Sequence, residues 1–309
     1  MLATASACPA IRSPPGPAVH VDMSATSAVP HVSLPQLRRL WLWLIVLCGV
    51  LANSVVTASV ELLPVRPGLI ASANYSPGRD DRPPVLLLHG FLQTANFFTI
   101  KRLHANLAEQ GYPVLSPTLT LGITQRAQSL DCEALHLHNL QQDVQELRQW
   151  VEWLTERHSQ PMVLIGHSAA GLVISRYLSE GPHSQPAATI LISPKYLRGD
   201  QQTSALPPDS AVPKIGTYPL GFCNRYPTTP QAYRSYVEWD SQRLLNALQQ
   251  MQPLPAIVLG SADDRLQNGW AGKLLASGLP VHQIEGANHF FDSTHELDLL
   301  EAIETLLDD

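Results

Sequence analysis

A serine lies where an apolar stretch gives way to a helix-like stretch, and this junction constrains the fold more than any other segment. Residues 162–165 are all apolar, which predicts a short strand buried on both faces of a sheet. Residues 169–179 have a helix-like pattern, which a glycine and a proline end at positions 181 and 182. Ser168 is therefore predicted to lie in a tight turn from strand to helix. Such a turn exposes the serine hydroxyl and points the helix N-terminus toward an anion formed beside it.

Strand-like and helix-like stretches alternate from residue 59 onward, which predicts a mainly parallel sheet wrapped by helices. The chain of 309 residues, 45% of them hydrophobic, is long enough for one large core. The predicted strands are residues 84–89, 113–116, 162–165, 188–192, 255–260 and 280–284. The predicted helices are residues 99–110, 139–157, 169–179 and 295–307. We expect the last helix to bury Leu297, Leu300, Ile303 and Leu307.

Two polar residues that follow predicted strands can activate Ser168. A serine hydroxyl is a weak nucleophile until a base removes its proton, and a third group must orient that base. His289 follows the strand at 280–284, and Asp263 follows the strand at 255–260. Because parallel strands end at one edge of the sheet, we expect the three side chains to meet there. Asp264 is the alternative acid; Asp263 is preferred because the acid normally occupies the first turn position after this strand.

The oxyanion of an acyl-transfer reaction also needs hydrogen-bond donors. The backbone N–H of Ala169, at the start of a predicted helix, is one predicted donor, and the N–H of Phe91 is the other. Gly90 precedes Phe91, and its missing Cβ lets the backbone approach the substrate closely. His89 and His167 are expected to be structural, with hydrogen bonds around the serine turn.

These motifs resemble those of the α/β-hydrolase superfamily. The matching segments are His89-Gly90, Gly166-His167-Ser168, Gly260-Ser-Ala-Asp263 and Gly286-Ala-Asn-His289. The resemblance covers roughly residues 84–309 and implies an α/β-hydrolase fold, with helices on both faces of a mostly parallel sheet. It also implies a Ser-His-Asp hydrolase that acts on esters and needs no metal or cofactor. Ala170 departs from the usual pattern, in which glycine takes this place, and its methyl group is expected to crowd the helix–strand contact.

The function favoured by these residues is ester hydrolysis of the carboxylesterase or lipase type, through an acyl-enzyme, on a small-molecule or lipid-like substrate. Two alternatives to ester hydrolysis use the same three residues: acyl transfer and thioester hydrolysis. A non-catalytic binding role is a third, which the complete residue set disfavours. The formal net charge of −6 and the isoelectric point near 6.0 give no electrostatic reason to expect nucleic acid as a partner.

A small cap over the site is predicted for residues 194–245, a long segment that is rich in proline and in aromatic residues. Two explanations of the rings stay open: contact with substrate, or packing within the cap. They are Tyr196, Tyr218, Phe222, Tyr226, Tyr233, Tyr236 and Trp239. Phe290 and Phe291 are expected either to line the pocket or to anchor the loop that carries His289.

A polar loop at residues 131–138 is expected to border the mouth of the site. Metal binding by this loop is a minor alternative, because the spacing fits no standard zinc pattern. Its ligands would be Cys132, Glu133, His136 and His138. Cys132 and Cys223 are the two cysteines beyond the N-terminal segment, and they are either a disulfide or two free thiols.

Residues 1–58 are predicted to be a signal peptide or an N-terminal membrane anchor with a disordered leader, and residues 59–309 the hydrolase domain. Two arginines precede an uncharged apolar block at 40–52, as in a signal sequence. Small residues favour cleavage after Ala58, so we expect an exported protein, periplasmic or secreted. Residues 40–60 are nearly long enough to span a bilayer, which leaves membrane association through an uncleaved anchor as the alternative.

Overall fold

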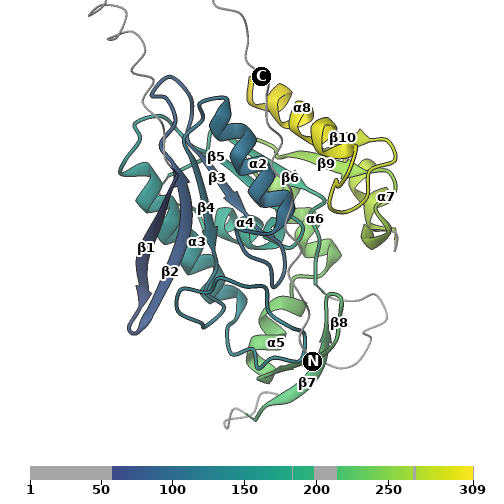
Figure 1. The fold of residues 1–309 in the computed structure, drawn as a ribbon. Helices are drawn as coiled ribbons and strands as arrows, with labels where there is room; N and C mark the ends of the chain where they lie inside the picture. The colour runs from purple at the N-terminus through teal and green to yellow at the C-terminus, as the bar shows by residue number, and fades with distance from the viewer. Residues whose placement is uncertain (1–57, 183, 198–213, 267–268, 309) are drawn as a thin grey trace, which may run out of the picture. The chain divides into compact units, whose positions relative to one another are not determined.

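An eight-stranded sheet forms the centre of the computed structural model, which describes residues 58–182, 184–197, 214–266 and 269–308 (Figure 1). The strands, in sheet order, are β1 (Ser59–Arg66), β2 (Leu69–Ser76), β4 (Val114–Thr118), β3 (Val85–Leu88), β5 (Val163–His167), β6 (Ala188–Ile192), β9 (Ala256–Gly260) and β10 (Val281–Ile284). Neighbouring strands from β4 to β10 are parallel, whereas β2 is antiparallel to both β1 and β4. The predicted mostly parallel sheet is therefore confirmed, with an added antiparallel hairpin, β1–β2.

Helices cover both faces of this sheet. They are α2 (Phe98–Glu109), α3 (Leu140–Thr155), α4 (Ala170–Ser179), α6 (Ser241–Gln250), α7 (Trp270–Leu275) and α8 (His295–Asp308). Buried side chains of α3, α4 and α6 belong to one hydrophobic cluster, and those of α2 and α8 belong to a second. Figure 1 shows α2 and α8 in front of the sheet, with α3 and α4 behind it.

The short apolar strands are buried on both sides because alternate residues contribute to different clusters. In β3, Leu86 and Leu88 pack into the cluster of α3 and α4, whereas Val85 and Leu87 pack into that of α2 and α8. This alternation follows from the two-residue period of a strand, and it requires an apolar residue at every position. It explains why continuous apolar runs located the central strands in the sequence.

The buried face of α8 differs from the predicted one. Leu299 and Ile303 are buried, whereas Leu297 is 70% exposed, so its predicted burial is wrong. Leu300 and Leu307 pack at the edge of the cluster. The buried pair is four residues apart and shares one helix face, while Leu297 precedes Leu299 by two positions and points to another side.

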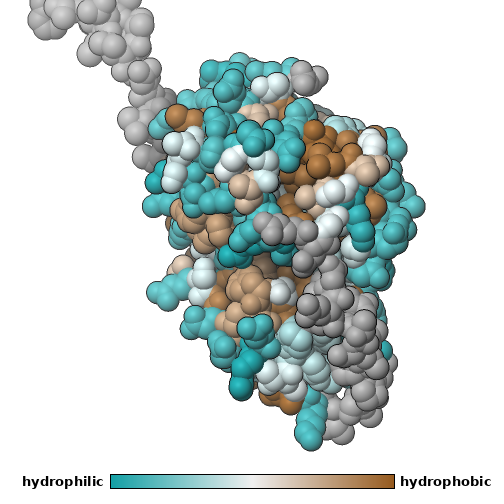
Figure 2. Space-filling model, turned by 90° about the vertical axis from the view of Figure 1, so that its right-hand side faces the viewer, coloured by the Kyte–Doolittle hydropathy of each residue, from teal (hydrophilic) through white to brown (hydrophobic). Residues whose placement is uncertain are grey.

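Figure 2 shows that apolar residues are exposed in patches on one face of the molecule.

The described part of the predicted cap contains a hairpin and a short helix. Strands β7 (Gly216–Leu220) and β8 (Cys223–Thr228) are antiparallel, and helix α5 (Pro230–Val237) follows them. Helix α6 begins inside the predicted cap but contacts α4 of the main layer. Among helices in the described ranges, none is long and apolar enough to cross a membrane. The segment predicted to direct export, up to residue 57, lies outside these ranges.

A disulfide ties the hairpin to the loop that precedes α3. Cys132 and Cys223 are bonded, with their Cα atoms 5.3 Å apart and a sequence separation of 91 residues. Beside this bond, His136 pairs with Thr228 of β8: its N–H donates to the carbonyl of Pro227 at 2.9 Å. Of the two alternatives open from the sequence, the structure shows the disulfide.

We expect the double variant Cys132→Ser/Cys223→Ser to lower the free energy of unfolding by about 2 to 5 kcal/mol, because the bond closes a long loop and restricts the unfolded chain. Urea denaturation of the wild type with and without reductant, beside the variant, measures this change. Equal midpoints for all three samples would show that the bond does not stabilise the fold.

Candidate active site

Ser168 occupies a left-handed turn between β5 and α4. Its φ of +57° is a conformation that non-glycine residues seldom adopt. The turn is held from both neighbouring segments: the Ser168 N–H donates to the carbonyl of Ile192 at 2.8 Å, and its own carbonyl accepts from Gly171 at 3.0 Å. The predicted strand–turn–helix geometry is therefore present, and its backbone strain is held by the surrounding hydrogen bonds.

Gly166 and Ala170 explain why this turn tolerates alanine where glycine is usual. A Cβ on Gly166 would lie 3.1 Å from the Cβ of Ala170 and 2.6 Å from Ile174 Cδ1. The methyl group of Ala170 thus packs over the missing side chain of Gly166, and Ala170 is only 1% exposed. The expected crowding is relieved by this pairing of a small residue with a glycine.

The structure brings His289 and Asp263 to Ser168. Ser168 Oγ lies 2.9 Å from His289 Nε2, and His289 Nδ1 lies 2.8 Å from Asp263 Oδ2. Because a carboxylate only accepts, Nδ1 carries the proton toward Asp263, which leaves Nε2 to accept from the serine hydroxyl. His289 and Asp263 are 3% and 5% exposed. This arrangement matches what activation of a serine nucleophile requires.

Of the two candidate acids, Asp263 makes the contact with His289, whereas Asp264 is exposed and begins a short 3₁₀ turn, Asp264–Leu266. Burial raises the pKa of Asp263, but its hydrogen bonds with His289 and the Arg265 N–H outweigh burial, so the net pKa is lowered. Asp263 is therefore ionised at neutral pH. The loops that carry acid and base are also joined, since the Ala262 N–H donates to the Ala287 carbonyl at 3.0 Å.

Phe91 and Ala169, which carry the predicted oxyanion donors, both line one pocket. Within the described ranges, the N–H groups of Phe91 and Ala169 have no hydrogen-bond acceptor. A Cβ on Gly90 would lie 3.2 Å from Ser168 Cβ, which agrees with the close approach expected there. The loop is supported by Arg126, a residue that the sequence reasoning missed. Its buried guanidinium donates to the carbonyls of Leu92, Gln93, Leu119 and Gln128.

Comparison with known proteins identifies the family of this chain. The model of the alpha/beta hydrolase family matches residues 85–301. The chain belongs to the alpha/beta hydrolase family. A search of curated protein sequences finds no match.

Several solved structures resemble this alpha/beta hydrolase at low sequence identity. Est1E from Butyrivibrio proteoclasticus is 15% identical, with a TM-score of 0.58 over 81% of this chain and 98% of that one. A thioesterase domain from the curacin biosynthetic pathway is 15% identical, with a TM-score of 0.54 over 82% of this chain and 100% of that one. The esterase domain of a Rhodothermus marinus protein is 17% identical, with a TM-score of 0.53 over 81% and 97%. These likenesses show the α/β-hydrolase fold.

Two pockets of this alpha/beta hydrolase meet at Phe91 and Leu197, which line both. The mouth pocket, of about 480 Å³ including its opening to solvent, contains Ser168 and His289. The inner pocket, of about 350 Å³ including its opening, lies beyond Phe91 and includes Ala169 in its wall.

Some aromatic residues of the cap line the pockets, and others are buried in the hydrophobic core. Phe222 is 58% exposed and lines the mouth pocket, as Phe290 does, whereas Phe291 is buried and anchors the His289 loop in the core. Tyr236 lines the inner pocket. The rings buried in the hydrophobic core are Tyr196, Tyr226, Tyr233, Tyr236 and Trp239.

The loop at 131–138 contributes to the inner pocket and offers no metal-ligand set. Cys132 forms the disulfide, so its sulfur is not a free thiolate ligand. The ring of His136 stacks on that of Tyr226, with ring centres 4.0 Å apart, and His138 lines the inner pocket. Among residues 58–308 with defined placement, no three His, Cys, Asp or Glu side chains gather as a metal site would require. Asp143, also in the pocket wall, was missed by the sequence reasoning.

His89 and His167 have the structural roles expected of them. His89 Nδ1 donates to the Gly90 carbonyl at 2.8 Å, and its Nε2 accepts from the Leu119 N–H at 3.0 Å. His167 Nε2 donates to the carbonyl of His289 at 2.9 Å. Burial lowers the pKa of each to about 3, helped at His89 by the charge of Arg126 and at His167 by His289.

These buried neutral histidines make stability fall in mild acid. Between pH 6.5 and 3 the unfolded chain protonates them and the folded chain does not, so each destabilises the fold by about 2 kcal/mol between pH 7 and pH 5. We expect His89→Gln to reduce the loss measured by urea denaturation at these two pH values. The same change at exposed His282 serves as the control. An unchanged loss in His89→Gln would contradict the neutral assignment.

Proposed function

We propose that this protein is a serine hydrolase that cleaves carboxylic esters through an acyl-enzyme. The observation that carries the proposal is the chain of hydrogen bonds from Ser168 through His289 to Asp263. It joins a nucleophile, a base and an orienting carboxylate from three different strand ends, a combination that a purely structural cluster does not need.

In the proposed reaction, His289 Nε2 takes the proton of Ser168 as Oγ attacks the ester carbonyl. The oxyanion that forms accepts hydrogen bonds from the N–H groups of Ala169 and Phe91. His289 then gives the proton to the leaving alcohol, and the carbonyl stays bonded to Ser168. Water, deprotonated by the same imidazole, attacks this acyl-enzyme; the bond between the acyl carbon and Ser168 Oγ breaks, the imidazolium returns its proton to Oγ, and the acid is released. Asp263 keeps the imidazole oriented and stabilises its positive charge throughout.

The substrate class rests on chemistry and on likeness together. Of the three similar solved structures, one is described as an esterase domain, one is the protein Est1E, and one is described as a thioesterase domain. A thioester would react by the same steps, so thioester hydrolysis is the second candidate. Acyl transfer differs only in the group that attacks the acyl-enzyme.

Labelling with a fluorophosphonate probe, followed by assay with p-nitrophenyl acetate and an acetyl thioester, tests this proposal. We expect covalent labelling at Ser168 and faster hydrolysis of the oxygen ester. A larger kcat/KM for the thioester, relative to its uncatalysed rate, would favour the second candidate. If the wild type were not labelled and did not hydrolyse either substrate, a hydrolase function would be rejected.

We also propose that the protein is exported, with its N-terminal segment as a signal or an anchor. The Cys132–Cys223 bond supports this location, since such bonds persist in oxidising compartments. Fractionation of cells with an antibody against the folded domain tests the proposal, and recovery of reduced protein from the cytosol would contradict it.

A further inference from the structure

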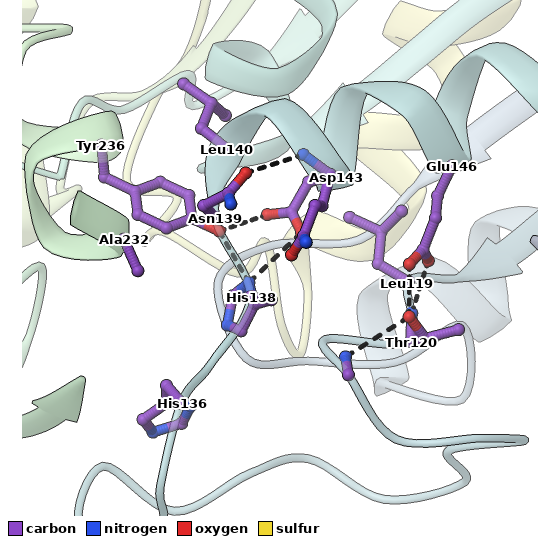
Figure 3. A network of polar contacts seen from close by, with 12 residues as sticks. Leu119, Thr120, His136, His138, Asn139, Leu140, Asp143, Glu146, Ala232 and Tyr236 are labelled. Atoms are coloured by element: carbon purple, nitrogen blue, oxygen red, sulfur yellow. Dashed lines mark hydrogen bonds and ion pairs between the residues drawn. The ribbon is translucent and has the colours of Figure 1, made fainter. Parts of the chain in front are cut away.

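A buried polar cluster forms part of the wall of the inner pocket. It consists of His138, Asp143 and Tyr236, which are 2%, 4% and 2% exposed and all line that pocket. Figure 3 shows the three side chains pointing toward one another, from the loop before α3, the first turn of α3 and helix α5. The other lining residues are largely apolar, among them Leu119, Leu172 and Val173.

The cluster satisfies its own hydrogen bonds in one consistent way. Tyr236 donates to Asp143 Oδ2 at 2.5 Å, and His138 Nδ1 donates to the Tyr236 oxygen at 2.7 Å. His138 Nε2 accepts from the hydroxyl of Tyr226 at 3.0 Å. Asp143 Oδ1 has only a longer contact, 3.2 Å, with His138 Nδ1, whose proton is nearer to Tyr236. The carboxylate therefore keeps acceptor capacity in the pocket wall.

The reaction geometry determines which part of the substrate reaches this cluster. The leaving oxygen must lie beside His289, which gives it a proton, and His289 lines the mouth pocket. The carbonyl oxygen must lie at the N–H groups of Phe91 and Ala169. Phe91 lines both pockets, whereas Ala169 lines the inner pocket and not the mouth pocket, and the inner pocket does not include His289. The remaining substituent on the carbonyl, the acyl chain, is thus directed into the inner pocket.

We propose that the inner pocket binds the acyl chain of the substrate and selects a chain that carries a hydrogen-bond donor, a hydroxyl or an ammonium, for Asp143. The inference rests on the proposed ester hydrolysis. A purely lipid acyl chain would be served better by apolar residues, because burial of a polar cluster is costly and apolar residues of similar volume often stabilise a protein equally well. A buried acceptor also discriminates strongly against an analogue that lacks the donor.

Matched pairs of p-nitrophenyl esters test the selection. Each pair differs by a terminal methyl or hydroxyl group: butanoate with 3-hydroxypropanoate, and heptanoate with 6-hydroxyhexanoate. We expect kcat/KM to be about tenfold or more higher for the hydroxyl member of at least one pair. The 6-aminohexanoate ester distinguishes the two donors, since Asp143→Asn, which keeps an acceptor but loses the charge, should penalise an ammonium more than a hydroxyl.

Variants connect the selection to the cluster. Asp143→Leu should lower the hydroxyl-to-methyl ratio about tenfold, and Tyr236→Phe should lower it less while disturbing the fold less. Glu146→Gln is the matched control. Glu146 lies on the same helix and is similarly buried, but it binds Thr120, as Figure 3 shows, and neither residue lines this pocket. Thermal melting and fluorophosphonate labelling verify that each variant is folded.

The outcomes separate this inference from the proposed function. An active wild type with no hydroxyl preference in either pair would overturn the inference and leave ester hydrolysis standing. A preference that persists in both Asp143→Leu and Tyr236→Phe would also overturn it. A wild type that is neither labelled nor active would reject the proposed function, and this inference with it.

Discussion

Replacement of Ser168 by alanine is expected to lower kcat for p-nitrophenyl ester hydrolysis by about 10⁴-fold or more. The variant retains the donors at Phe91 and Ala169 and the base at His289, but no atom remains to form the acyl-enzyme. Only the small catalysis provided by binding and oxyanion stabilisation should persist. Fluorophosphonate labelling should be lost in parallel, as measured by fluorescence after denaturing electrophoresis.

Ser179→Ala is the matched control for this experiment. Ser179 is the last residue of α4, the helix that follows Ser168, but it is exposed and its hydroxyl donates to the carbonyl of Arg176. We expect it to leave both kcat and labelling at the wild-type level. Hydrolysis that survived undiminished in Ser168→Ala would mean that another residue is the nucleophile.

The second large effect is expected for Asp263→Asn, with a loss in kcat of about 10⁴-fold. The amide can donate to His289 Nδ1, which stabilises the tautomer with its proton on Nε2. That tautomer cannot accept the proton of Ser168. Steady-state kinetics with the same ester measures the loss, and KM should change little because Asp263 is not in the wall of either pocket.

Asp264→Asn provides the comparison for Asp263. Its side chain is exposed and its neighbour makes the contact with His289, so we expect activity within about twofold of wild type. The reverse pattern, a loss in Asp264→Asn alone, would assign the orienting carboxylate to Asp264 and refute the assignment made from the structure.

The sequence predicted those parts of the fold where local pattern and tertiary environment agree. Central strands such as β5 are apolar at every position because both faces are covered, and this pattern is readable without a structure. The β1–β2 hairpin was missed, since its half-exposed positions and its Pro64 give no such run. Cys132 and Cys223 could not be paired from sequence, because pairing depends on distances across 91 residues.

The candidate site shows the same division. Ser168, Asp263 and His289 each follow a recognisable strand, so the topology alone places them at one edge of the sheet. Asp143 had a signal that was overlooked: it lies on the face of α3 that Leu140, Val144 and Leu147 make apolar. A charged residue on such a face requires a buried partner. That partner, Tyr236, comes from a helix 93 residues away, which only the fold could show.

The support of His289 from two sides has a consequence for the energetics of turnover. Its loop is tied to the acid loop through Ala262 and Ala287, and its carbonyl is held by His167, the neighbour of Ser168. The ring therefore has little orientational entropy left to lose when a substrate binds. The cost of aligning it is met during folding, so reorganisation adds little to the activation barrier.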